Sequence, residues 1–219
     1  SIDQIVNQAA KWYYMNAGQQ HVPIVIRMII GRGWGQGPQH AQSLESWFGH
    51  IPGLKVVMPS NPYDAKGLLI SSILDDNPVI FLEHRWLYDL VGEVDDELEI
   101  PLSSSKILKS GNDMTIVSCS WMTAEANQAA RILSENGINS EVIDVRTVTP
   151  LDSETITNSV NKTGYAVIAD NDWQFCGFSA ELSAQITEKC FDNLKAPPVR
   201  IGLAHVPCPT TRPLENLFY

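Results

Sequence analysis

The sequence predicts an α/β fold made of two consecutive units, each built around a mostly parallel sheet. Short apolar runs of strand length alternate with segments of helical periodicity along most of the chain. The alternation fails once, between His84 and Ser105, where an acidic run precedes a stretch of proline and serine. We therefore predict a first unit over residues 1–92, a connector over residues 93–105 and a second, smaller unit over residues 106–219.

The first unit is predicted to open with a helix, because apolar residues recur at helical spacing over residues 3–16. The next strand, residues 22–30, is apolar on both faces, as is typical of a central parallel strand. The remaining predicted elements are a helix over 39–48 with Leu44, Trp47 and Phe48 turned inward, a strand over 54–58, a helix over 62–74 and a strand over 79–82. Asn61 and Pro62 favour a helix start, as a cap and as the first helical residue.

The second unit repeats the pattern of strand and helix. Four strands are predicted, over residues 114–119, 140–145, 165–169 and 199–203. Three helices lie between them, over residues 123–136, 152–161 and 179–191. This order predicts a mostly parallel sheet with right-handed crossovers.

Composition excludes two classes of function. The formal net charge of −10 provides no basic face for nucleic acid, and the apolar runs are too short for a membrane span. The four cysteines form no CxxC pair, so we expect reduced thiols in a bacterial cytoplasm or an organelle matrix. The charge itself identifies no partner.

The loop after the first strand carries glycines at positions 31, 33, 35 and 37. Such a loop between a strand and a helix could cradle a phosphate with backbone amides. It lacks the GxGxxG spacing and the P-loop lysine, so a flexible turn remains the alternative. Trp34 at its tip suggests contact with a ligand or another chain.

His40 follows this loop and is the best single candidate for chemistry. A neutral imidazole can give and take a proton near pH 7. Its neighbours Gln39 and Gln42 are polar, which argues against a core position. The alternative is a surface or capping histidine.

Asp75, Asp76 and Asn77 close the helix predicted over residues 62–74. A helix C-terminus carries partial negative charge, and these side chains add oxygen ligands, so a monovalent or hard cation could bind there. A plain helix stop before Pro78 would need no ion.

Several long segments resemble one protein family. In chain order they include GPQHAQSLESWFGHIPGLKVVMPSNPYDAKGLL, DDNPVIFLEHRWLY, IDVRTVTPLD and APPVRIGLAHVPCP. They resemble the beta subunit of the thiamine-diphosphate-dependent 2-oxo acid dehydrogenases, of which pyruvate dehydrogenase is one, and more loosely transketolase. The resemblance implies that residues 1–92 are the C-terminal part of a thiamine pyrimidine-binding domain and residues 106–219 a transketolase C-terminal domain.

The same resemblance implies an activity and partners. The expected reaction is oxidative decarboxylation of pyruvate or a related 2-oxo acid on thiamine diphosphate with magnesium, followed by acyl transfer to a lipoyl group. The expected partners are an alpha subunit in an α2β2 assembly, or a second copy in a homodimer, and the lipoyl domain of the acyltransferase component. The cofactor would be held mainly by the partner chain and by a segment upstream of Ser1.

Residue by residue, His40 matches the family histidine that assists acylation of the lipoyl group, in a motif that here reads QHA. The family also implies a potassium site formed by the carbonyls of Ile24, Ser72 and Ile73 with Asp75 and Asn77. The glutamate that contacts the aminopyrimidine is expected upstream of Ser1. We therefore expect a chain truncated at its N-terminus, with no cofactor-binding residue of its own and no activity alone.

Two alternatives stay open on the sequence. One is a non-catalytic fragment or paralogue that serves as a subunit-interaction module. The other is a transketolase-type enzyme acting on sugar phosphates, which would need basic residues near the site. Only Arg27, Arg32 and Arg85 are near the predicted cleft, which disfavours it.

Overall fold

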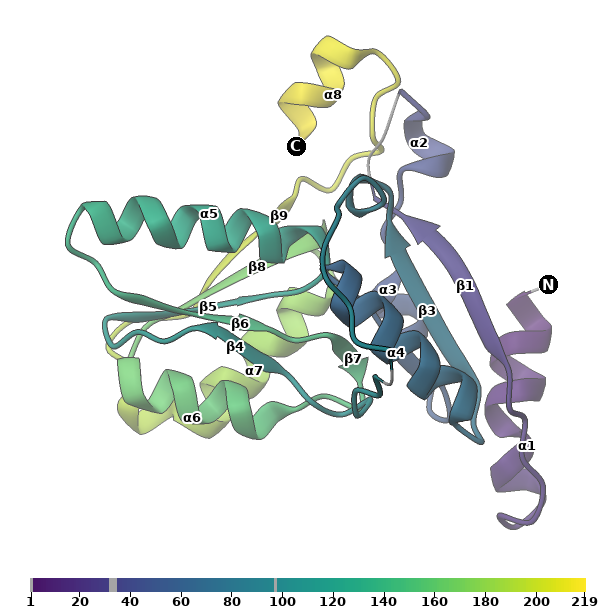
Figure 1. Ribbon diagram of the computed structural model, residues 1–219. Helices are drawn as coiled ribbons and strands as arrows, with labels where there is room; N and C mark the ends of the chain where they lie inside the picture. Colours follow the sequence, from purple (N-terminus) through teal and green to yellow (C-terminus); the bar gives the residue numbers. More distant parts are fainter. Residues whose placement is uncertain (1, 32–34, 97) are drawn as a thin grey trace.

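The computed structural model describes residues 2–31, 35–96 and 98–219. It contains two mostly parallel sheets, which confirms the predicted fold class (Figure 1). The first sheet has the strand order β1-β3-β2-β7 and the second the order β4-β6-β5-β8-β9. The edge strands β7 and β4 run antiparallel to their neighbours, and the other pairs are parallel.

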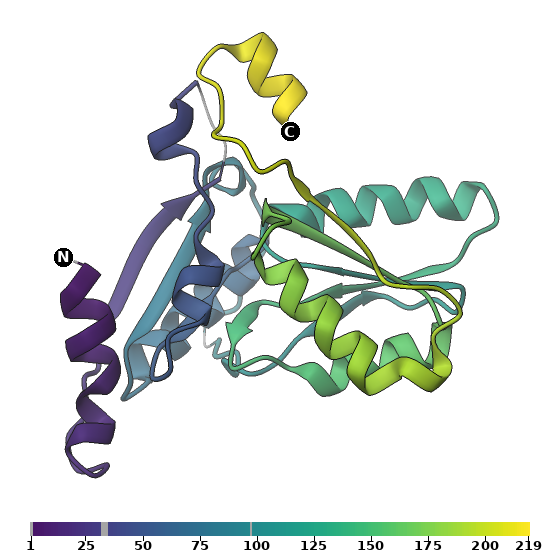
Figure 2. The ribbon, with the colours of Figure 1, turned by 180° about the vertical axis from the view of Figure 1, so that it is seen from behind.

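The first domain follows the predicted order closely. Its elements are η1 (Gln4–Ala9), α1 (Ala10–Met15), β1 (Val25–Ile30), α2 (Gly37–His40), α3 (Glu45–Gly49), β2 (Lys55–Val57), α4 (Pro62–Leu74), β3 (Val79–His84) and η2 (Arg85–Leu87). Helix α4 begins where predicted, because the Asn61 side chain accepts a hydrogen bond from the Asp64 amide at 2.9 Å. In Figures 1 and 2, α4 covers one face of the first sheet and α3 covers the other.

The prediction of one helix over residues 39–48 is wrong. Two short helices, α2 and α3, stand there instead, and residues 41–44 between them are not helical. The carbonyls of His40, Ala41 and Gln42 accept hydrogen bonds from elsewhere in the fold, so they do not continue a helix. Phe48 is buried as predicted, but Trp47 is 63% exposed because the break changes which face of α3 meets the core.

The second domain contains more elements than the pattern predicted. They are β4 (Lys106–Lys109), β5 (Met114–Ser118), α5 (Trp121–Glu135), β6 (Ser140–Asp144), β7 (Thr147–Thr149), α6 (Ser153–Thr163), β8 (Ala166–Trp173), α7 (Phe178–Cys190), η3 (Phe191–Asn193), β9 (Val199–Leu203) and α8 (Arg212–Phe218). Strands β4 and β7 and helix α8 were not predicted from the sequence. Strand β7 leaves the second domain and pairs with β2, so the two domains share a sheet.

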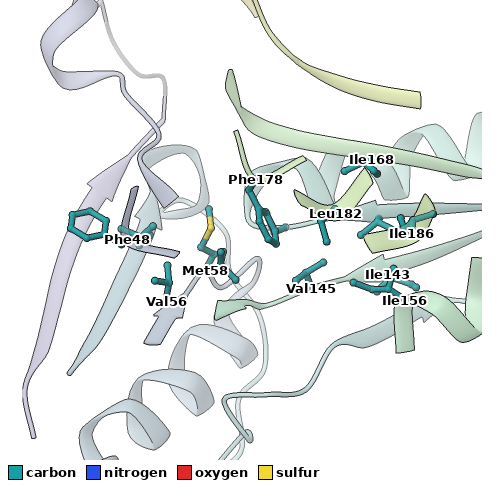
Figure 3. Packing of buried hydrophobic residues seen from close by; sticks show 14 of the residues in the cluster. Phe48, Val56, Met58, Ile143, Val145, Ile156, Ile168, Phe178, Leu182 and Ile186 are labelled. Carbon is teal, nitrogen blue, oxygen red and sulfur yellow. The ribbon is translucent and has the colours of Figure 1, made fainter. Parts of the chain in front are cut away.

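One hydrophobic cluster runs without interruption from the first domain into the second (Figure 3). Phe48 and Met58 contribute from the first domain, and Val145, Phe178 and Leu182 from the second. Burial of each such side chain stabilises the folded state by about 1.5–3 kcal/mol. The junction between the domains is therefore part of the folding core rather than a loose contact.

The connector is only partly solvated. Its acidic residues Glu93, Asp95 and Asp96 are exposed, but Leu98 and Ile100 are buried against α4. A Cβ at Gly67 of α4 would lie 2.7 Å from the Ile100 side chain, so glycine makes room for the connector there. None of the helices in the described part of the chain has the length and apolar content needed to cross a bilayer.

Candidate active-site face

The carboxyl ends of β1 and β3 lie side by side. Ile30 of β1 is in register with His84 of β3. Gly31 follows β1 and Arg85 follows β3, so the glycine loop and the turn after β3 leave the sheet at one edge. This is the edge at which open α/β sheets place their ligands.

Gly31 is required by this arrangement. Its φ is +75°, and a Cβ on it would lie 2.1 Å from the His84 ring. The His84 ring in turn stacks on Trp121 of α5 with 5.9 Å between ring centroids, and Trp86 meets the same indole edge-on at 5.1 Å. The second domain therefore contributes a wall to the face at which β1 and β3 end.

His40 is the last residue of α2, and its side chain is exposed. Its backbone carbonyl accepts a hydrogen bond from the Arg85 guanidinium. The structure thus places His40 on the carboxyl side of β1, where the sequence predicted a side chain able to face a cleft. Arg32, Gly33 and Trp34 lie outside the described residues, and so do the predictions made for Trp34 and for a phosphate cradle at the loop tip.

The C-terminal segment crosses from the second domain to this loop. Figure 1 shows α8 beside α2. A Cβ at Gly37 would lie 2.4 Å from the Thr210 Oγ1, and the Tyr219 hydroxyl donates to the Ala41 carbonyl at 3.3 Å. The C-terminal segment, far from His40 in sequence, therefore helps to shape its surroundings.

The residues expected to hold potassium lie at the opposite end of β1. The Ile24 carbonyl accepts a hydrogen bond from the Val79 amide at 2.9 Å, and Asp75 caps the C-terminus of α4. The Asp75 carboxylate accepts from the Asn77 backbone amide at 2.9 Å and from the Lys55 ammonium group. Burial raises the pKa of Asp75, but the hydrogen bonds from Lys55 and Asn77 outweigh it and leave that pKa lowered.

A buried group of carboxyls was missed by sequence reasoning. Glu45 of α3 is fully buried, and neither of its carboxyl oxygens has a hydrogen-bond donor among the described residues. Burial raises the pKa of Glu45 well above its ordinary value, and the neighbouring Asp170 and Asp172 of β8 raise it further. Burial also raises the pKa of Asp172 to about 6. Asp170 and Asp172 could have been found from the sequence, because they directly follow the apolar strand predicted over residues 165–169.

This group is suited to hold protons rather than a metal. Among the residues that the structure describes, no set of three or more His, Cys, Asp or Glu is arranged to hold a metal ion. Two neighbouring carboxyls form a hydrogen bond only when one of them carries a proton. A cavity of about 1100 Å³ lies beside the group, lined by Ser46 and Trp47 of α3 and by Asp172. His40 is not part of its lining.

Two family models match the chain. One, described as the transketolase C-terminal domain, covers residues 103–219, and the other, described as the transketolase pyrimidine binding domain, covers residues 2–90. The chain belongs to the transketolase family. In this transketolase-family chain the two domains are joined by the sheet that β2 and β7 share. They also meet at the carboxyl ends of β1 and β3, where His84 stacks on Trp121.

Curated relatives are similar over almost the whole chain. The acetoin:2,6-dichlorophenolindophenol oxidoreductase subunit beta of Cupriavidus necator is 44% identical over 217 residues, which is 99% of this chain and 64% of the relative. The mitochondrial pyruvate dehydrogenase E1 component subunit beta of Rattus norvegicus is 44% identical over 222 residues, 99% of this chain and 62% of the relative. This transketolase-family chain thus spans less than two thirds of the length of these relatives.

A solved structure shares the fold. It is described as a split gene transketolase, inactive beta4 tetramer, and it superposes with a TM-score of 0.77 at 22% identity. The match covers 99% of this chain and 66% of the other. At this identity the likeness supports the architecture of the transketolase-family chain alone.

Proposed function

We propose that this chain is the beta subunit of the decarboxylating component of a 2-oxo acid dehydrogenase. The proposed reaction is the oxidative decarboxylation of pyruvate or a related 2-oxo acid, with transfer of the acyl group to a lipoyl arm. The observation that carries the proposal is 44% identity, over nearly the whole chain, to beta subunits named for acetoin oxidation and for pyruvate dehydrogenation.

In this proposal His40 manages a proton during acyl transfer. Its side chain is exposed at the carboxyl end of β1, where a lipoyl arm and a bound cofactor could both reach it. An imidazole can supply a proton to a leaving sulfur and accept one back at neutral pH. Thiamine diphosphate, when bound, supplies the carbanion chemistry, while the protein orients the reactants and controls protons.

The diphosphate and its magnesium are assigned mainly to an alpha partner in an α2β2 assembly. At the His40 face the guanidinium of Arg85 already donates to the backbone carbonyls of Gly31 and His40, so it is not free to bind a diphosphate. The lipoyl domain of the acyltransferase component would be the second partner. Relatives of bacterial and mitochondrial origin support a bacterial cytoplasm or an organelle matrix as the location.

A potassium ion at the C-terminus of α4 is a separate part of the proposal. The carbonyls of Ser72 and Ile73 belong to the last turn of α4, where carbonyls lack intrahelical partners, so the donors suit a hard cation. The Lys55 ammonium group, which was not predicted to lie here, already forms an ion pair with Asp75. A higher Tm in potassium than in sodium at equal ionic strength would support the ion, and equal Tm values would remove it.

The test uses the chain assembled with a candidate alpha subunit. We expect decarboxylation of at least one 2-oxo acid, followed with an artificial electron acceptor, and acylation of a lipoyl domain, followed by mass. His40→Ala should slow lipoyl acylation by about 100-fold, the scale of general acid–base catalysis, and decarboxylation much less.

His21→Ala is the matched control. It removes an exposed histidine near the amino end of β1, where the ring meets the Tyr13 ring at a tilt of 40° with 4.9 Å between centroids. It should leave both half-reactions unchanged. Equal rates for His40→Ala and wild type in both half-reactions would show that His40 has no role in acyl transfer. An assembled complex with no activity on any 2-oxo acid or on acetoin would favour the interaction module.

A further inference from the structure

The backbone carbonyls of residues 40–42, where α2 ends, accept hydrogen bonds from three donors outside this segment. The His40 carbonyl accepts from the Arg85 guanidinium, and the Ala41 carbonyl accepts from the Tyr219 hydroxyl at 3.3 Å. The Gln42 carbonyl accepts from the Gly31 amide at 3.2 Å. In a continuous helix these carbonyls would bond to amides four residues later. The tertiary donors therefore fix both the end of α2 and the place of His40.

Arg85 ties the two ends of the glycine loop together. The same guanidinium nitrogen that reaches the His40 carbonyl also donates to the Gly31 carbonyl at 2.7 Å. The residue is only 7% exposed, and burial lowers the pKa of its guanidinium. Hydrogen bonds from a charged donor are roughly twice as strong as neutral ones, and they offset the cost of burying the cation.

Both of these acceptors of Arg85 are backbone carbonyls. By contrast, Arg27 on the neighbouring strand is 57% exposed at its side chain and pairs with Glu83 at 2.7 Å. No ion pair within 4.0 Å is found for Arg85 among the described residues. Its cation is thus used to set the course of the backbone around His40 rather than to neutralise an acid.

We propose that Arg85 is a positioning residue, which acts through the backbone of the loop to fix where the His40 side chain stands at the active-site face. The Tyr219 hydroxyl assists from the C-terminal segment. The inference rests on the proposed function for its catalytic consequence, because His40 is the group that is positioned. Its structural part is that Arg85 holds the backbone at Gly31 and at His40, which we call the Arg85 clamp. This part can be tested on the chain alone.

The first measurement is amide hydrogen exchange of the isolated chain. In Arg85→Met the Gly31 amide, which bonds to the Gln42 carbonyl, should exchange about tenfold faster or more, because local opening no longer has to break the Arg85 contacts. Arg27→Met removes a cation between the same two strands without touching the loop, and it should leave this amide unchanged. Equal exchange in the two variants would overturn the inference, whatever the activities are.

The second measurement is a double-mutant cycle in the assembled enzyme. Arg85→Met alone should slow lipoyl acylation by about 10- to 100-fold, the scale expected when a catalytic group moves by about 1 Å. Added to His40→Ala it should cause no further loss, because Arg85 acts through His40. Losses that multiply would mean a general structural role and would overturn the inference.

Tyr219→Phe provides a milder variant in case Arg85→Met folds poorly. It removes one hydroxyl and should reproduce a smaller part of both effects, with the same absence of further loss beside His40→Ala. Unchanged exchange at Gly31 together with unchanged acylation in this variant would count against the clamp. A His40→Ala enzyme that acylates lipoyl at the wild-type rate would instead show that the proposed function of His40 is wrong. The hydrogen-exchange rates would still show whether Arg85 holds the backbone at Gly31 and His40.

Discussion

On one side of the junction between the domains, Asp64 of α4 binds the guanidinium of Arg146 inside the protein. On the other side, Glu45 of α3 lies against Asp170 of β8, and no ion pair within 4.0 Å is found for either acid among the described residues. Both contacts join the first domain to the second, and all four side chains are less than 9% exposed. The first contact pairs an acid with a cation, whereas the second brings acids together and avoids an unpaired buried charge only by holding protons.

Serines support the acids on both sides. Ser60 donates to Asp144 beside Arg146, and Ser46 donates to Asp172 at 2.6 Å beside Glu45. Burial raises the pKa of Asp144 to about 7 and that of Asp172 to about 6. The comparison teaches that stability on the Arg146 side should depend on the cation as well as on the protonation of Asp144, whereas stability on the Glu45 side should depend on protonation alone.

The largest effect is expected for Arg146→Met. It leaves Asp64 buried without its cation, which costs about 3–5 kcal/mol when a buried pair is broken. Chemical denaturation at pH 7 should show this loss in the free energy of unfolding. Adding Asp64→Asn should recover much of it, because no uncompensated charge then remains. A loss below about 1 kcal/mol for Arg146→Met would mean that this side does not depend on its cation.

The second effect is a pH dependence set by the three acids on the Glu45 side, to which Asp144 on the Arg146 side adds because its pKa is raised as well. The folded protein binds more protons at Glu45, Asp170 and Asp172 than the unfolded chain does, since all three pKa values are raised. Their stabilisation is fully present below the unfolded values, near 4, and is lost as pH rises through the folded values. The free energy of unfolding should fall between pH 5 and 8 by up to about 1.4 kcal/mol per pH unit for each proton released.

Glu45→Gln tests which group carries that slope. Glutamine is neutral at every pH, and its side-chain amide can donate to a neighbouring carboxylate, as a protonated carboxyl can. The variant should therefore flatten the slope and be more stable than wild type at pH 8, by about 1 kcal/mol or more. Urea denaturation of both proteins at pH 5 and pH 8 provides the measurement. Parallel curves would show that Glu45 is not the titrating group.

These two sides also differ in how far the sequence could predict them. Helix α4, which carries Asp64, is marked locally by Asn61 and Pro62, and its bounds were predicted correctly. Glu45 lies in the polar run QSLES, where neighbouring residues are typical of a surface helix start. Its burial depends on β8, more than a hundred residues later, and no local pattern encodes that contact.

The candidate site shows the same division. A strand followed by a glycine loop predicted that His40 would follow the carboxyl end of β1, because this order is encoded within about ten residues. The break after α2 could not be predicted, since its causes are Arg85 and Tyr219. Strand β7 was missed for a related reason: three residues carry little periodicity, and their partner β2 belongs to the other domain.

The smallest effect is expected from the same substitution on each side, Ser46→Ala and Ser60→Ala. Each removes one hydroxyl donor from a buried carboxylate, so each should raise the pKa of its acid further and cost about 1 kcal/mol where that acid is ionised. For Ser46→Ala the loss should be present at pH 8 and smaller at pH 5, where Asp172 with its pKa of about 6 is mostly protonated. For Ser60→Ala the loss should grow over a range about one pH unit higher, because the pKa of Asp144 is about 7. Denaturation of both variants at half-unit steps of pH would resolve the offset, and two coincident curves would mean that the serines do not act through these acids.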